Sequence, residues 1–218
     1  DYIIADDIVA PPELRPFFSE KIASLPDTYW GTDDRRADPA PPPSRAQAGL
    51  PETGFVFCCF NNNWKITPEM FDLWMRLLKT VPDSVLWLLK DNETAAANLR
   101  KEVRARGVDE KRLIFAPRVS PKEHLVRHQL ADLFLDTLPY NAHTTASDAL
   151  WMGLPVVTKL GETFAGRVGA SLLTAIGLPD LITHTPRDYE ALALRLATEP
   201  AALADVKHRL VANRLTHP

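Results

Sequence analysis

Short apolar runs alternate with longer amphipathic runs through most of this chain, from residue 55 to residue 177. The short runs are typical of buried strands, which we predict at 55–60, 84–90, 112–116, 133–137 and 155–158. In the longer runs apolar residues recur three and four positions apart, which predicts helices at 68–81, 93–107, 121–131, 144–153 and 167–177. Glycine closes several of these runs, as it commonly does just past the end of a helix.

The alternation predicts an α/β fold built on a Rossmann-like parallel sheet with helices on both faces, because parallel strands need crossover connections that are usually helical. Ligands of such sheets bind at the carboxyl ends of the strands. The loops that follow the predicted strands are therefore where the chemistry is expected.

Two segments precede the alternating region. Residues 1–36 hold a short apolar strand at 2–4 and a helix-compatible stretch at 13–25. These elements are too small to form a hydrophobic core of their own. Residues 37–53 are rich in proline, alanine and small polar residues and lack apolar side chains to bury, which predicts an extended linker. Residues 54–218 then form the α/β domain.

The composition narrows the class of protein. The chain has 218 residues and is 45% hydrophobic, enough for one good-sized core. Its net charge of -3, with both signs interspersed, predicts neither a nucleic acid nor a membrane as a partner. Cys58 and Cys59 are adjacent, so a disulfide between them is unfavourable and a reducing compartment is indicated. No signal peptide or membrane-spanning run is recognised, and we expect a cytoplasmic protein.

Several common catalytic patterns are missing from the sequence. No G-x-G-x-x-G follows the first predicted strand of the alternating region, and no P-loop occurs. A G-x-S-x-G nucleophile elbow and a carboxylate pair for glycoside hydrolysis are not recognised either. His124 and His128 have the spacing of a metal pair, but no third ligand accompanies them, and we predict no metal site.

A cradle for an anion is present in the segment "NAHTTASDAL". Thr144 or Thr145 begins a helix there, and the free N–H groups and positive dipole end of a helix attract an anion. Asp148 lies one turn later and could accept hydrogen bonds from sugar hydroxyls. The spacing by itself favours a Thr144 that only caps the helix, with Asp148 compensating its dipole, because caps are common.

Two further loops carry candidate ligand-binding side chains. Lys65 follows the strand at 55–60 and could reach a phosphate, although a solvated loop lysine is the plainer reading. Asn62 is a turn former first and a donor second. His124 lies at the loop-facing end of its helix, where a neutral imidazole could stack on a nucleobase with Arg127 nearby.

Three long segments, "FNNNWKI…WMRLLKTVPDSVLWLLK", "RLIFAPRVSPKEHLVRHQLADLFLDT" and "YNAHTTASDALWMGLPVVTKLGETFAGRVGASLL", resemble the C-terminal catalytic half of the protein O-GlcNAc transferase family. That family also includes the SPINDLY-type O-fucosyltransferases. The opening residues resemble the segment through which the family's N-terminal catalytic half leads into the C-terminal one. The proline-rich linker replaces the large insert of animal members, which indicates a bacterial type.

The resemblance implies a GT-B architecture that grips UDP-GlcNAc mainly through this half and transfers the sugar, with inversion, to Ser or Thr hydroxyls of a protein acceptor. It assigns catalytic importance to Lys65 and His143. It also implies that the leaving diphosphate is stabilised without a metal cofactor. The implied donor-binding residues are Asn62 (commonly glutamine in the family), Lys65, Thr144 and Thr145 at the diphosphate, His143 beside it, Asp148 at the ribose, His124 with Arg127 at the uracil, and Gly31 near the sugar.

Two alternatives stay open at this stage. The chain could be a module that holds a nucleotide without transferring sugar, since most of the family's N-terminal catalytic half and its tetratricopeptide repeats are absent from this sequence. Within the enzyme class, the donor could be GDP-fucose in place of UDP-GlcNAc.

Overall fold

The structure, a computed structural model, describes residues 1–33 and 41–217. Its centre is a six-stranded sheet in the order β5-β4-β3-β6-β7-β8, and all its paired strands run parallel. The predicted parallel sheet is therefore confirmed, although β8 and the helix directly after it were not predicted. The strands are β3 (Val56–Cys59), β4 (Val85–Leu89), β5 (Leu113–Ala116), β6 (Leu133–Leu135), β7 (Val156–Lys159) and β8 (Ile182–Thr183).

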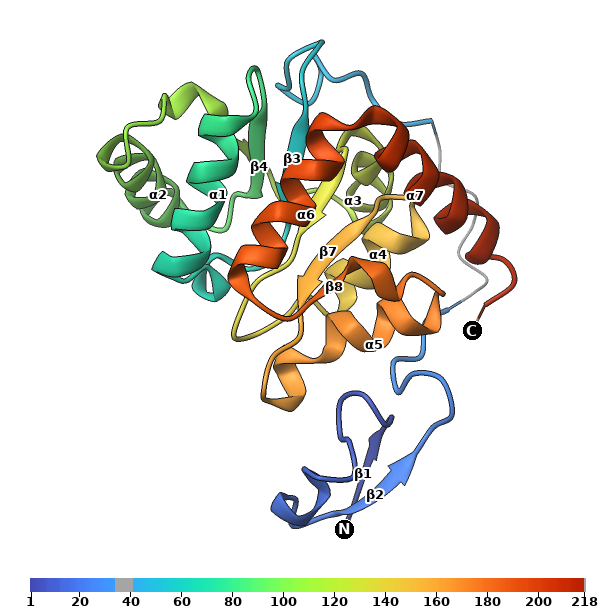
Figure 1. Cartoon of the computed structure of the whole chain (residues 1–218). Helices are drawn as coiled ribbons and strands as arrows, with labels where there is room; N and C mark the ends of the chain where they lie inside the picture. The colour runs from blue at the N-terminus through green and yellow to red at the C-terminus, as the bar shows by residue number, and fades with distance from the viewer. Residues whose placement is uncertain (34–40, 218) are drawn as a thin grey trace.

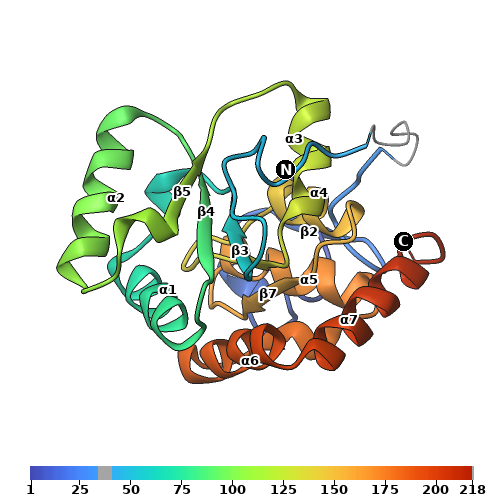
Figure 2. The same ribbon diagram turned by 90° about the horizontal axis from the view of Figure 1, so that it is seen from above.

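Helices cover both faces of the sheet, as predicted. Helix α6 packs against α1 and against β6 and β7, and Figure 2 shows α1 and α6 on one side of the strands with α3 and α4 on the other. The helices are α1 (Pro68–Thr80), α2 (Glu93–Ala105), α3 (Pro121–Arg127), α4 (Thr144–Trp151), α5 (Val168–Ala175), α6 (Pro186–Thr198) and α7 (Pro200–Asn213).

The chain changes direction across the sheet between β3 and β6. From β3 it moves outward through β4 to β5, and from β6 it moves the other way through β7 to β8. The loops that leave the carboxyl ends of β3 and β6 therefore diverge to opposite faces of the sheet. A crevice opens at such a switch point, which is the usual ligand site of an open α/β sheet.

Glycines end three of the helices, as the sequence predicts. Gly107, Gly153 and Gly177 follow α2, α4 and α5 with φ of 69°, 76° and 72°, a backbone region that L side chains rarely adopt. Helix α3 is shorter than predicted, because the chain continues from Arg127 as a 3-10 turn at His128–Leu130. The His128 ring occupies the carbonyls of the preceding turn, with Nδ1 at 2.8 Å from His124 O.

The predicted helix at 13–25 is wrong. This stretch forms a 3-10 turn (Arg15–Phe17) and strand β2 (Lys21–Ser24), which pairs in parallel with β1 (Tyr2–Ala5). Pro16 lacks the N–H that a helix interior needs, and a partner strand is available for the residues after it. The small two-stranded sheet lies below α5 in Figure 1.

The N-terminal segment is tied to α5 through one buried carboxylate. Asp6, only 1% exposed, accepts hydrogen bonds from the backbone N–H groups of Val9 at 2.9 Å and Tyr29 at 2.8 Å. Its other strong contact is the Ser171 hydroxyl of α5, which donates to it at 2.6 Å. Arg167 adds a hydrogen bond from Nε to Ile8 O. Residues 1–33 are thus joined to the α/β domain by buried polar contacts.

The predicted linker is less extended than expected where it is described. Its first residues, 37–40, lie outside the described part of the chain. Further on, Leu50 is 4% exposed, and Arg45 donates to Asp132 and to Gly54 O, both at 2.9 Å. The prediction that this segment has nothing to bury is therefore wrong at Leu50.

Two smaller expectations concern the pair of cysteines and membrane-spanning helices. Cys58 and Cys59 on β3 are both described, both buried and both free thiols, in agreement with the sequence prediction. Within residues 1–33 and 41–217, no helix is long and apolar enough to cross a bilayer.

Candidate functional site

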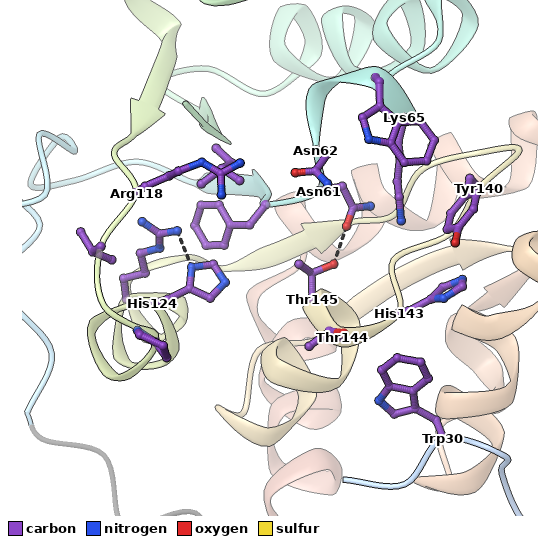
Figure 3. A pocket seen from close by; sticks show the side chains of 16 residues that line it. Trp30, Asn61, Asn62, Lys65, Arg118, His124, Tyr140, His143, Thr144 and Thr145 are labelled. Atoms are coloured by element: carbon purple, nitrogen blue, oxygen red, sulfur yellow. Dashed lines mark hydrogen bonds between the residues drawn. The ribbon is translucent and has the colours of Figure 1, made fainter. Parts of the chain in front are cut away.

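A cavity of about 690 Å³ lies at the switch point between β3 and β6. Its volume falls in the range of small-molecule sites. Segments after β3, β5 and β6 line it, and Figure 3 shows side chains from these segments facing one another across the space. The cavity brings together these predicted site residues: Asn62, Lys65, His124, Arg127, His143, Thr144 and Thr145.

Lys65 brings a positive charge to one wall of the cavity. Its ammonium donates to Asn141 O at 2.8 Å and lies 3.9 Å from the centre of the Tyr140 ring. Burial lowers the pKa of Lys65, and the nearby carboxylate of Asp136 opposes this shift. A half-buried ammonium that donates to a carbonyl and lies over aromatic rings keeps N–H groups and positive charge for an anion.

Helix α4 directs its amino end into the same cavity. Thr144 is its first residue, as predicted, while the N-cap is His143. The interpretation of Thr144 as the cap is therefore wrong, and no side-chain capping bond from His143 is found among the described residues. His143 O accepts from Ala146 N and Ser147 N, so the N–H groups of Thr144 and Thr145 form the positive end of the helix.

A chain of hydrogen bonds fixes this helix start to strand β3. The Thr145 hydroxyl donates to Asn61 Oδ1, and Asn61 Nδ2 donates to Thr137 Oγ1 at 2.7 Å. Thr137 in turn donates to Tyr140 O at 2.7 Å. Asn61 is 2% exposed. The two loops of the switch point are therefore held as one unit before any ligand enters.

The opposite end of the cavity is built on α3. Ser120 and Glu123 form a capping box that fixes the start of this helix, and His124 and Arg127 follow on one face. Arg127 is 5% exposed and donates to Pro117 O at 2.7 Å and to His124 Nδ1. Since arginine only donates, Nδ1 accepts and the proton of a neutral His124 is on Nε2. The structure thus gives Arg127 a role in orienting His124.

Replacing Arg127 with methionine is expected to weaken nucleotide binding at this end about tenfold, because a charged hydrogen bond of this kind contributes roughly 1.5–3 kcal/mol and His124 would lose its orientation. Titration calorimetry with UDP measures the change. Arg106→Met is the matched control, since Arg106 pairs with Glu102 and Asp72 away from the cavity. Unchanged UDP affinity in Arg127→Met would show that His124 does not depend on it.

Burial should also make the stability of this region pH dependent. Burial and, second, Arg127 lower the pKa of His124 to about 4, and burial lowers that of His128 to about 3. The unfolded chain binds these protons near pH 6.5, so between 6.5 and 4 it holds more protons than the folded chain and stability falls as the pH falls. Asp136 opposes this trend, since burial raises its pKa to about 6 and the folded chain binds its proton first.

The contribution of His128 can be isolated by substitution. In His128→Met, the free energy of unfolding should fall less steeply with decreasing pH between 6 and 4, by about 1.4 kcal/mol per pH unit. Urea unfolding of both proteins at several pH values gives the two slopes. Equal slopes would mean that His128 is not buried in its neutral form.

Two predicted site residues lie outside the lining of the cavity. Asp148 is buried on α4, one turn below the helix start, and is 8% exposed. Gly31 is exposed, and its neighbour Trp30 lines the cavity in its place. The ribose role of Asp148 and the sugar role of Gly31 stay predictions.

The structure adds lining residues that the sequence interpretation missed. Some could have been found by position, because Asn61 is the second residue after β3 and Tyr140 shares a loop with His143. Arg118 follows β5 in the same way and pairs with Asp91 at 2.7 Å. The aromatic members could not be anticipated from spacing. The missed residues are Trp30, Phe60, Asn61, Trp64, Leu89, Arg118, Val119, Pro121 and Tyr140.

The described residues contain no cluster of three or more His, Cys, Asp and Glu side chains that could hold a metal ion. His124 and His128 do lie together, with ring centres 4.9 Å apart. His128 is fully buried, and its Nδ1 is used by backbone carbonyls. The pair is part of the helix packing against Phe60.

A parallel α/β sheet with this cavity at the carboxyl ends of its central strands is the architecture of the C-terminal half of a GT-B glycosyltransferase. Comparison with known proteins identifies the family. The chain belongs to glycosyl transferase family 41, whose family model matches residues 41–218.

Named relatives agree with this membership. A probable UDP-N-acetylglucosamine–peptide N-acetylglucosaminyltransferase SEC of Arabidopsis thaliana is 38% identical over 224 residues, which cover 100% of this chain and 23% of the plant protein. The UDP-N-acetylglucosamine–peptide N-acetylglucosaminyltransferase of Caenorhabditis elegans is 42% identical, over 77% of this chain and 14% of its own length.

A solved structure extends the similarity to three dimensions. A mutant of the Thermobaculum terrenum O-GlcNAc transferase superposes with a TM-score of 0.87 at 31% identity, over 99% of this chain and 41% of that one. The match therefore includes most of the N-terminal segment as well as the α/β domain. The chain spans less than half the length of each of these three proteins.

Proposed function

We propose that this chain is the donor-binding half of an inverting glycosyltransferase that transfers N-acetylglucosamine from UDP-GlcNAc to Ser or Thr hydroxyls of proteins. The observation that carries the proposal is the cavity at the switch point. It combines a half-buried lysine, a helix amino end and a neutral histidine within one space. The names of the plant and nematode relatives support the same donor and a peptide acceptor.

The geometry suggests how the donor lies. A diphosphate between Lys65 and the N–H groups of Thr144 and Thr145 would meet positive charge on two sides. The uracil would then reach His124, whose Nε2–H faces away from Arg127. His143 would lie beside the diphosphate and the sugar, on the Tyr140 side of the cavity (Figure 3).

In the reaction, the acceptor hydroxyl gives its proton to a base or to water and its oxygen forms a bond to the anomeric carbon, while the bond from that carbon to UDP breaks and leaves its electron pair on UDP. The developing charge on the diphosphate is the charge that Lys65 and the start of α4 would stabilise. We propose that these groups suffice without a metal cofactor. Transfer should then persist in EDTA, and loss of transfer on chelation with recovery on adding Mg²⁺ or Mn²⁺ would refute this part.

Titration calorimetry with UDP tests the donor site directly. The folded chain should bind UDP and prefer it to GDP at least tenfold, and no measurable binding would overturn the proposal. Tighter binding of GDP would favour the GDP-fucose alternative. Incubation of the complete polypeptide with labelled UDP-GlcNAc and a protein acceptor separates an enzyme from a module that only holds the nucleotide, since only an enzyme labels the acceptor.

The cellular setting is part of the proposal. Two buried free thiols and no disulfide among the described residues fit a reducing compartment, and we propose the cytoplasm. Tetratricopeptide repeats upstream of residue 1 would supply a surface for the protein acceptor. Sequencing the complete gene would show whether tetratricopeptide repeats precede residue 1.

A further inference from the structure

The donor cavity has an aromatic rim beside its lysine. Trp64 is 65% exposed and Tyr140 is 36% exposed, although both are large apolar side chains that line the cavity. Figure 3 shows Tyr140 and Lys65 on the side of the cavity away from His124. An exposed tryptophan at the edge of a polar cavity is available to contact a ligand.

The distances place this rim next to any phosphate that Lys65 binds. The Lys65 ammonium is 3.9 Å from the centre of the Tyr140 ring and 5.6 Å from the centre of the Trp64 ring. A phosphate oxygen that accepts a hydrogen bond from this ammonium would lie about 3 Å from it. A group attached to that phosphate on the side of the rings would therefore be within reach of Trp64 or Tyr140.

Tyr140 and Trp64 differ in how much of each ring is still open to a ligand. Tyr140 is stacked on His143, with centres 4.9 Å apart and planes 24° apart, and it also receives the Lys65 ammonium. Trp64 meets Tyr140 edge to face, with centres 5.3 Å apart and planes at 78°. Most of the indole is consequently open to a ligand, and Tyr140 acts as its support.

We propose that Trp64 is the stacking platform for the sugar of the donor, an inference that rests on the proposed function. A pyranose ring carries C–H groups on its faces, which lose water favourably against an indole. The uridine end would lie at His124, across the cavity. Trp64 should therefore contribute to binding of UDP-GlcNAc and not to binding of UDP.

Calorimetric titration of the full chain with UDP and, separately, with UDP-GlcNAc tests this. Trp64→Ala should bind UDP-GlcNAc about tenfold more weakly than the wild type while UDP affinity changes less than about twofold. Trp64→Phe, which keeps an aromatic face, should recover most of the loss. Phe17→Ala is the matched control, because Phe17 is 84% exposed and does not line the cavity.

The possible outcomes are distinct. Equal weakening of UDP and UDP-GlcNAc in Trp64→Ala would overturn the inference, since Trp64 would then act only by supporting Lys65. No weakening of either ligand would overturn it as well. If the wild type binds UDP and Trp64→Ala binds UDP-GlcNAc as tightly as the wild type does, the proposed function survives and this inference fails. If the folded wild type does not bind UDP, both fail.

Discussion

Replacing Lys65 with methionine is expected to weaken UDP binding about 100-fold and to lower transfer about 1000-fold, because it removes the cation that would face the diphosphate. Methionine keeps the length and apolar stem of the side chain, so the loss is confined to the charge. The effect on transfer should be the larger, since the negative charge on the diphosphate grows as the sugar leaves. Calorimetry and an assay with labelled UDP-GlcNAc measure the two effects.

Lys101→Met provides the control, because Lys101 is an exposed lysine on α2. It should bind UDP as the wild type does. If Lys65→Met and Lys101→Met were equally affected, or equally unaffected, Lys65 would be an ordinary loop lysine and the diphosphate would be held elsewhere.

Introducing aspartate at Thr144 should separate binding from stability. An acidic side chain in the first turn of α4 interacts favourably with the helix dipole, by roughly 0.3–1 kcal/mol, so the melting temperature should stay the same or rise. The same charge would repel a diphosphate at the helix start and displace it from the N–H groups. We expect UDP affinity to fall about 100-fold.

Thr144→Asn is the control, since it adds a polar group of similar size without charge. Thermal unfolding monitored by circular dichroism and calorimetry with UDP give the two readouts. A Thr144→Asp variant that binds UDP normally would refute a diphosphate at this helix, and one that binds poorly only because it unfolds would show a lowered melting temperature.

The sequence was most informative where the physical signal is local. The strands and helices of the α/β domain follow from apolar periodicity, and glycine marks the ends of α2, α4 and α5. The stretch at 13–25 was misjudged because its strand depends on β1, a partner whose pairing no local pattern reveals. Strand β8 has only two residues, too few to show a period.

The site residues also fall into those that a local sequence pattern predicts and those that only the structure reveals. Lys65, His143 and Thr144 could be predicted because each follows a strand that the pattern locates, and the family resemblance then gave them roles. Arg127 was predicted as a member of the site, but only the structure shows that its guanidinium is directed at His124 and Pro117. Trp30 comes from a segment far away in sequence, which no spacing rule could bring to the cavity.

The Asp6 contacts have a consequence for motion. Residues 1–33 precede the α/β domain in sequence, yet they supply Trp30 to the cavity at the switch point and are joined to α5 through Asp6 and Ser171. When the two halves of a GT-B enzyme open and close on a donor, this segment should travel with the half described here. The unit that moves with the cavity therefore includes residues from Asp6 onward and does not begin at residue 54, where the α/β domain begins.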